Sequence, residues 1–189
     1  MRNCYAGLIE LGYKKIAVTG DSAGGTLALE LLLSLKASQL NNQVVSVAGV
    51  ALSPIMDLSL SSASWATRSA ADPYFTQLQT AELVQFYLNG ADPSDPSVSP
   101  LHANLAGLPP IRVHVGDDEV LDDSVRFVDR ALAAGVDAQL DIWEGMVHGF
   151  PGSIGQLSAS TQALQQLGSF LSERFTKTTV ERQTYRRTG

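Results

Sequence analysis

The 189-residue chain contains one cysteine, Cys4, so no disulfide can form within it. This excludes a small secreted fold that depends on internal disulfides, and we expect Cys4 to be buried as a small apolar residue. The first residues also lack the basic start and apolar core of a signal peptide. Together these absences predict a soluble, cytoplasmic protein.

Basic charge and long apolar runs are scarce as well. The 13 basic residues are outnumbered by 19 acidic residues, which gives a net charge of −6. No basic excess is available to neutralise phosphates, so nucleic acid is not an expected partner. The longest apolar run, near residues 27–35, is interrupted by Glu30 and Ser34 and is shorter than the roughly 20 apolar residues of a membrane span.

What the chain does contain is an alternation of short apolar runs and helical patterns. It predicts an α/β fold, in which a parallel sheet of about four strands is flanked by helices on both faces. Residues 1–175 are expected to form this domain, and the basic tail at 176–189 is expected to be disordered. The predicted strands are 16–19, 44–52, 111–115 and 138–143, and the predicted helices are 1–11, 23–40, 76–88, 122–134 and a last one with Leu164, Leu167, Leu171 and Phe175 on one stripe.

The segment after the first predicted strand, Gly20-Asp21-Ser22-Ala23-Gly24-Gly25, carries a Gly-x-Ser-x-Gly pattern between a strand and a helix. Such a sharp turn holds the serine in a strained conformation, and the glycines two before and two after it let neighbouring backbone pass. The Ser22 hydroxyl would then lie at a helix N-terminus, where the N–H of Ala23 can stabilise an oxyanion. We therefore predict Ser22 as a nucleophile, in preference to a glycine-rich turn that contains a serine by chance.

A serine nucleophile needs a base, and the chain has three histidines. His114 falls inside a predicted strand, which indicates a structural residue. His102 lies in a proline-rich connection away from any predicted strand end. His148 follows the fourth strand in a loop flanked by Gly145 and Gly149, which suits a base that approaches the serine. His148 is therefore the predicted base, and an ordinary surface-loop histidine is the alternative.

The base in turn needs an acid to orient it, and five acids follow the third predicted strand. Asp122 and Asp123 are better interpreted as caps of the next helix. Spacing alone leaves Asp117, Asp118 and Glu119 open. The order of serine, acid and histidine is that of α/β-hydrolases and the reverse of that in trypsin-like proteases.

These motifs resemble the hormone-sensitive-lipase-like branch of α/β-hydrolase esterases. Residues 20–25 resemble its nucleophile motif, and residues 145–150 its histidine motif. Residues 118–121 resemble its acid motif, which implies Asp118 as the acid of the triad. Other segments similar to this branch are Ser53-Pro54, Asp57-Leu58, Asp72-Pro73, Ser99-Pro100-Leu101 and Gly107-Leu108-Pro109-Pro110.

The resemblance also implies a function. Its members hydrolyse carboxylic esters, often with short acyl chains, without a metal or an organic cofactor. The substrate expected here is accordingly a small-molecule ester. Residues 56–91 would be part of a lid over the acyl pocket, with the aromatic residues Trp65, Tyr74, Phe75, Phe86 and Tyr87 either lining that pocket or packing elsewhere.

One feature of that branch is missing. Its members carry a His-Gly-Gly-Gly-type segment upstream of the serine, whereas the 21 residues before Ser22 contain no such run. The chain is thus similar to the C-terminal part of the fold, and Ala23 would be left as the donor to the oxyanion. The strand at 16–19 would also become an exposed edge, which predicts a homo-oligomer or pairing with an N-terminal partner segment.

Three functional hypotheses follow. The first is a serine carboxylesterase with the triad Ser22, Asp118 and His148, whose activity is impaired by the missing oxyanion loop. The second is a truncated module that acts only in assembly or binding. The third keeps the triad but changes the substrate to a thioester, a lactone or a peptide, because the fold does not choose among these.

Overall fold

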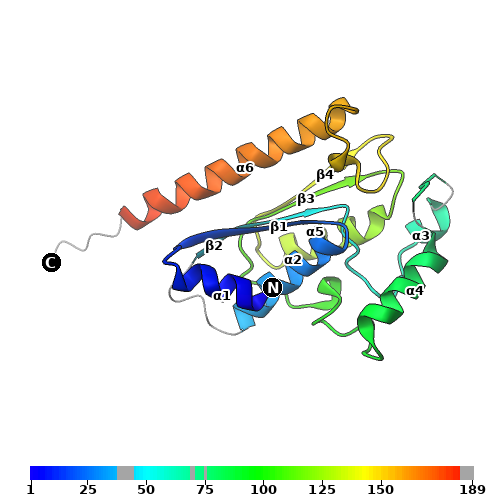
Figure 1. Ribbon diagram of the computed structural model, residues 1–189, viewed down its shortest axis with the longest axis horizontal. Coiled ribbons are helices and arrows are strands. Elements are labelled where there is room, and N and C mark those ends of the chain that lie inside the picture. Colours follow the sequence, from blue (N-terminus) through cyan, green and yellow to red (C-terminus); the bar gives the residue numbers. More distant parts are fainter. Residues whose placement is uncertain (38–44, 69–70, 75, 184–189) are drawn as a thin grey trace.

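The computed structural model describes residues 1–37, 45–68, 71–74 and 76–183. Within them, four strands form one parallel sheet in the order β1-β2-β3-β4. The strands are β1 (Lys15–Asp21), β2 (Val45–Leu52), β3 (Ile111–Gly116) and β4 (Ala138–Trp143). Because all four run the same way, their carboxyl ends lie along one edge of the sheet (Figure 1).

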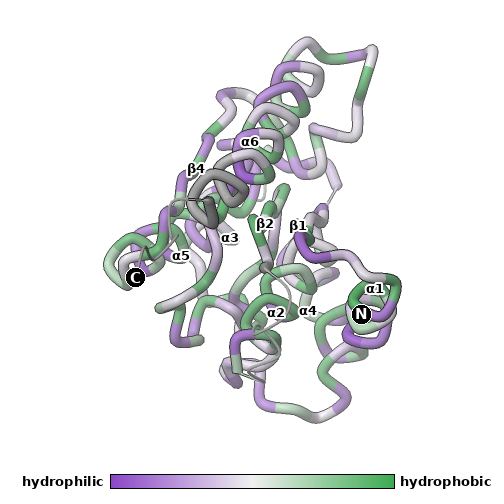
Figure 2. The backbone as a smooth tube through the Cα atoms, turned by 90° about the vertical axis from the view of Figure 1, so that its left-hand side faces the viewer, coloured by the Kyte–Doolittle hydropathy of each residue, from purple (hydrophilic) through white to green (hydrophobic). Residues whose placement is uncertain are grey.

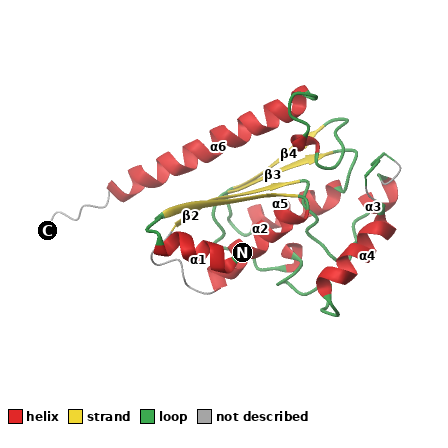
Figure 3. Ribbon diagram, in the orientation of Figure 1, coloured by secondary structure: helices red, strands yellow, loops and turns green. Residues whose placement is uncertain are grey.

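Helices cover both faces of the sheet (Figure 3). On one face lie α1 (Arg2–Glu10), α2 (Ala23–Ala37) and α5 (Leu121–Ala133), and on the other lies α6 (Ser158–Gln183). Side chains of β2 alternate between the faces, as in any strand. Ala51 packs with Leu29 and Phe127 of α2 and α5, whereas Val50 packs with Phe170 of α6. The end-on view in Figure 2 shows the apolar strands between these layers.

The long connection between β2 and β3 holds α3 (Ser64–Thr67), α4 (Gln77–Leu88) and the short 3-10 helix η2 (Pro100–His102). A capping box fixes the start of α4: Thr76 accepts from the backbone of Gln79, and the Gln79 side chain accepts from the Thr76 backbone. Asn89, in a left-handed conformation, ends the helix. A second 3-10 helix, η3 (Phe150–Gly152), follows β4.

The predicted fold class is confirmed, with two local differences. The N-cap of α5 is Val120, so Asp122 and Asp123 do not cap that helix. Asp123 is instead fully buried and accepts hydrogen bonds from the backbone of Met56 and Asp57, which fixes the start of the β2–β3 connection. Sequence spacing could not show this contact, because its two sides are 66 and 67 residues apart.

The ends of the chain also differ from expectation. Helix α6 continues to Gln183, so the backbone is helical well past residue 176, and residues 184–189 lie outside the described residues. Cys4 is exposed rather than buried, because α1 buries Tyr5 alone of its residues. No helix in the described part of the chain combines the length and apolar character needed to cross a bilayer.

Candidate active site

One side chain after each strand reaches the same point at the carboxyl edge of the sheet. Ser22 follows β1, Ser53 follows β2, Glu119 follows β3 and His148 follows β4. Hydrogen bonds join the four: Ser53 to Glu119, Glu119 to His148, and His148 to Ser22. The sheet edge therefore builds one continuous polar line from segments that are up to 126 residues apart.

Ser22 sits in the sharp turn that the sequence predicts. Its φ of 55° is in the left-handed region that side chains rarely adopt, and its N–H donates to the Leu52 carbonyl at 2.8 Å. A Cβ on Gly20 would lie 2.0 Å from the Gly24 carbonyl oxygen, so this position requires glycine. Gly24 differs from expectation, because a Cβ there would meet open space and it is its carbonyl that crowds Gly20.

His148 connects the serine to a carboxylate. Its Nε2 lies 2.8 Å from the Ser22 hydroxyl oxygen, and its Nδ1 lies 2.9 Å from Glu119 Oε2. An ionised carboxylate only accepts, so Nδ1–H donates to Glu119 and Nε2 is left to accept the Ser22 proton. The side chains of His148 and Glu119 are 8% and 1% exposed, which keeps water from competing for these bonds.

Burial lowers the pKa of His148, but the hydrogen bond and charge of Glu119 outweigh it, and the charges of Asp72 and Asp21 act in the same direction. The net result is a pKa above the usual 6.5. Burial raises the pKa of Asp21, and the nearby His148 opposes that rise. The neighbouring acids thus stabilise the protonated imidazolium form of His148, which a general base needs when it takes up a proton.

The acid contacting His148 is Glu119, not Asp118, which corrects the prediction. Glu119 Oε1 also accepts from the backbone N–H of Gly116 at 2.8 Å. The turn after β3 directs the Asp118 side chain outward, where it is 38% exposed and lies 3.9 Å from Arg68. Asp117 binds the backbone N–H of Gly145 and so fixes the histidine loop instead.

Ser53 is a site residue that the sequence analysis missed. It is 1% exposed and has a φ of 43°, the same unusual backbone region as Ser22. Its hydroxyl donates to Glu119 Oε1 at 2.7 Å and accepts from the Gly149 N–H at 3.2 Å. The signal available was its position directly after a predicted strand, the place where each of the other three residues was sought.

The other two histidines lie outside this line, as predicted. His114 is buried in β3, where Trp143 donates to its Nδ1 at 3.0 Å, and burial lowers its pKa to about 4. His102 lies 3.2 Å from Asp57 in the β2–β3 connection. The imidazole that contacts the Ser22 hydroxyl is that of His148.

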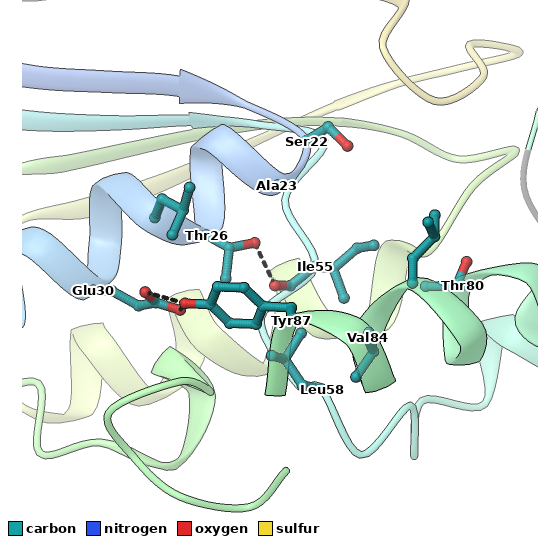
Figure 4. A pocket seen from close by; sticks show the side chains of 11 residues that line it. Ser22, Ala23, Thr26, Glu30, Ile55, Leu58, Thr80, Val84 and Tyr87 are labelled. Carbon is teal, nitrogen blue, oxygen red and sulfur yellow. Dashed lines mark hydrogen bonds between the residues drawn. The ribbon is translucent and has the colours of Figure 1, made fainter. Parts of the chain in front are cut away.

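An apolar cleft of about 280 Å³ opens beside Ser22 between α2 and α4 (Figure 4). Of the five aromatic residues named for a lid, Tyr87 lines it, whereas Trp65 is buried against Leu60 and Val120. Phe86 and Tyr74 are exposed, and Phe75 lies outside the described residues. No group of three or more histidine, cysteine or acidic side chains in the described ranges could hold a metal ion.

A serine, an imidazole and a carboxylate linked in this order at the carboxyl edge of a parallel sheet are typical of α/β-hydrolases. The family model described as alpha/beta hydrolase fold matches residues 6–152, and the chain belongs to this family.

Relatives of the chain include esterases and acetyl-hydrolases. The chain is 34% identical over 170 residues to an acetyl-hydrolase of Streptomyces hygroscopicus, a match covering 88% of this chain and 56% of that protein. It is 34% identical over 159 residues to an esterase of Acinetobacter venetianus, covering 83% and 52%. The crystal structure of an esterase from the bacterial hormone-sensitive lipase family superposes with a TM-score of 0.85 at 38% identity, covering 90% and 57%. The chain thus spans about half the length of the curated relatives it matches.

Proposed function

We propose that the chain carries the reacting side chains of a carboxylic ester hydrolase, with Ser22 as nucleophile, His148 as general base and Glu119 as the orienting acid. The observation that carries this proposal is the unbroken hydrogen-bonded line from Glu119 through His148 to Ser22. The esterase and acetyl-hydrolase relatives support an ester as substrate. The apolar cleft next to Ser22 supports an apolar acyl chain.

In the proposed reaction, Ser22 Oγ attacks the ester carbonyl while its proton passes to His148 Nε2. Glu119 stabilises the imidazolium that forms. When the tetrahedral intermediate collapses, the bond to the alcohol oxygen breaks and His148 returns the proton to the leaving alcohol. A water molecule then attacks the acyl-enzyme by the same proton path, which releases the carboxylic acid and restores Ser22.

The oxyanion would accept a hydrogen bond from the backbone N–H of Ala23, the first residue of α2. The N–H groups of the first helical turn have no acceptor within their own helix, and the helix dipole favours negative charge there. Loss of a single donor to the oxyanion typically lowers kcat by about 10²–10³. The second candidate function is a module without turnover that acts in assembly or binding.

Labelling and turnover together test these alternatives. We expect a fluorophosphonate probe to label the protein at Ser22, and an activated short-chain ester to give a burst of alcohol release that Ser22→Ala abolishes. Labelling without a burst would support the module without turnover. Absence of labelling in folded protein, or an unchanged burst in Ser22→Ala, would overturn the choice of nucleophile. Rates with matched thioesters, lactones and peptides would then define the acyl compound attacked.

Assembly is proposed through the edge of β1. Among the described residues β1 pairs with no strand other than β2, so the backbone groups of residues 16–21 on its other edge have no described strand to pair with. Another strand, from a second copy or from an N-terminal segment, would satisfy them. Sedimentation at several protein concentrations checks this, and a concentration-independent monomer with a solvent-exposed β1 in hydrogen exchange would contradict it.

A further inference from the structure

The cleft beside Ser22 has a regular construction. Two helix faces with the same i, i+3, i+4, i+7 spacing line it, and such a spacing puts four side chains on one side of a helix. Ile55 and Leu58 of the β2–β3 connection complete the apolar lining (Figure 4). The two faces are Ala23, Thr26, Leu27 and Glu30 on α2, and Thr80, Leu83, Val84 and Tyr87 on α4.

A carboxyl group lines the part of this cleft that is remote from Ser22 (Figure 4). The Tyr87 hydroxyl donates to both carboxylate oxygens of Glu30, at 2.9 and 3.2 Å. The two threonine hydroxyls of the lining donate to backbone carbonyls, Thr26 to Ile55 and Thr80 to Thr76. Glu30 is therefore the ionisable carboxyl that a ligand in the cleft would meet.

The Glu30 carboxylate keeps unused hydrogen-bonding capacity. A carboxylate offers about four acceptor positions, and Tyr87 supplies one O–H. No lysine or arginine forms an ion pair with Glu30 within the described residues. Burial raises the pKa of Glu30 to about 7, and the Tyr87 hydrogen bond opposes this rise without cancelling it.

The distance of Glu30 from Ser22 also limits which ligands can contact it. It lies eight positions after Ser22, which corresponds to about 12 Å along a helix axis. A short acyl chain on Ser22 would end among the apolar lining residues Ile55, Leu58 and Val84, whereas a longer chain that follows the cleft would end against the Glu30 carboxylate.

We propose that Glu30, held by Tyr87, selects among acyl chains long enough to reach it and favours those ending in a protonated amine over alkyl chains of equal length. This inference rests on the proposed function, because it takes the acyl chain to be attached at Ser22. An alkyl end would strip water from the carboxylate without replacing its hydrogen bonds, which is unfavourable. An ammonium end would supply a charge-assisted hydrogen bond instead.

The test compares two p-nitrophenyl esters of equal chain length, spanning about 12 Å, one ending in a methyl group and one in an amine. In the wild-type chain we expect kcat/KM for the amine-ended ester to exceed that for the alkyl ester by about tenfold, since the pair is only half-buried. Glu30→Gln, which keeps the shape of the side chain, is expected to abolish this preference. Tyr87→Phe is expected to reduce it, because the carboxylate is no longer held.

Glu82→Gln is the matched control, because Glu82 is an exposed glutamate on α4 outside the cleft. It is expected to retain the full preference. Equal preferences in wild type and Glu30→Gln would overturn the inference, and circular dichroism would establish that each variant is folded.

A binding measurement separates this inference from the proposed function. The N-methyl amides of the same two acyl chains are titrated into wild type and Glu30→Gln by calorimetry. If the protein hydrolyses no ester, tighter binding of the amine-ended amide by wild type alone would support the role of Glu30 while the proposed function fails. If esters are hydrolysed with no preference for the amine, the proposed function stands and the role of Glu30 is overturned. If the protein neither hydrolyses esters nor binds the amine-ended amide more tightly, the proposed function and the role of Glu30 are both overturned.

Discussion

The strand-end line and the cleft beside it are built in opposite ways. In the strand-end line, Ser53, Glu119 and His148 are buried, and each hydrogen bond is held by a backbone segment that a strand positions. In the cleft, Leu83 and Tyr87 are 57% and 49% exposed, and they lie on a helix outside the sheet. The proposed proton transfer demands fixed geometry, and these buried, hydrogen-bonded side chains supply it. Recognition of an acyl chain tolerates a less rigid lining, so a peripheral helix such as α4 can provide it.

The sharpest test of this contrast compares separate substitutions of two neighbouring acids, Glu119 and Asp118. Glu119→Gln keeps the size of the side chain but removes the charge that stabilises the His148 imidazolium, and we expect kcat to fall by about 10³–10⁴. Asp118→Asn removes an exposed charge beside Arg68 and should change kcat less than about threefold. Steady-state hydrolysis of a short-chain ester measures both. The reverse order of effects would show that the acid rearranges when substrate binds.

A smaller effect is expected one step further from the serine. Ser53→Ala removes a donor to Glu119 and leaves its buried Oε1 with the Gly116 N–H alone. We expect kcat to fall about tenfold with KM little changed, and the free energy of unfolding to fall by about 1–3 kcal/mol. Ser53→Gly relieves the positive φ and also lacks the hydroxyl, so an equal loss of kcat would assign the effect to the hydrogen bond. Full activity in both variants would mean that Ser53 only packs.

The smallest effect concerns pH. In the proposed reaction the neutral form of His148 accepts the Ser22 proton, and the neighbouring acids raise the pKa of His148 above 6.5. The rate should therefore fall as pH drops through a value above 6.5, because protonation removes the base. Asp21→Asn removes one of these acids, so the acidic limb of kcat/KM should move down by less than about one pH unit. An unmoved limb in Asp21→Asn would show that Asp21 does not influence the base, and Asp118→Asn serves as the exposed control.

Much of the fold and of the candidate site can be predicted from local sequence patterns. The Gly-x-Ser-x-Gly turn, the alternation of strands and helices, and the glycine-flanked His148 are short-range features, and the structure places their side chains in one line. The resemblance to the acid motif implies Asp118, whereas Glu119 contacts His148, because a motif cannot show which way a turn directs two adjacent side chains. The interpretation of Asp123 as a helix cap is wrong for a related reason, since its backbone partners lie more than 60 residues away.

The sequence by itself determined the layered α/β fold, the strained turn at Ser22 and the order of serine, acid and base, because strand and helix periodicities and glycine positions are local properties of the chain. Only the tertiary structure decided that Glu119 contacts His148, that Ser53 supports Glu119, and that Tyr87 reaches Glu30 across 57 residues. Each of these contacts depends on where the sheet and the β2–β3 connection bring distant side chains, and packing of the whole domain fixes those positions.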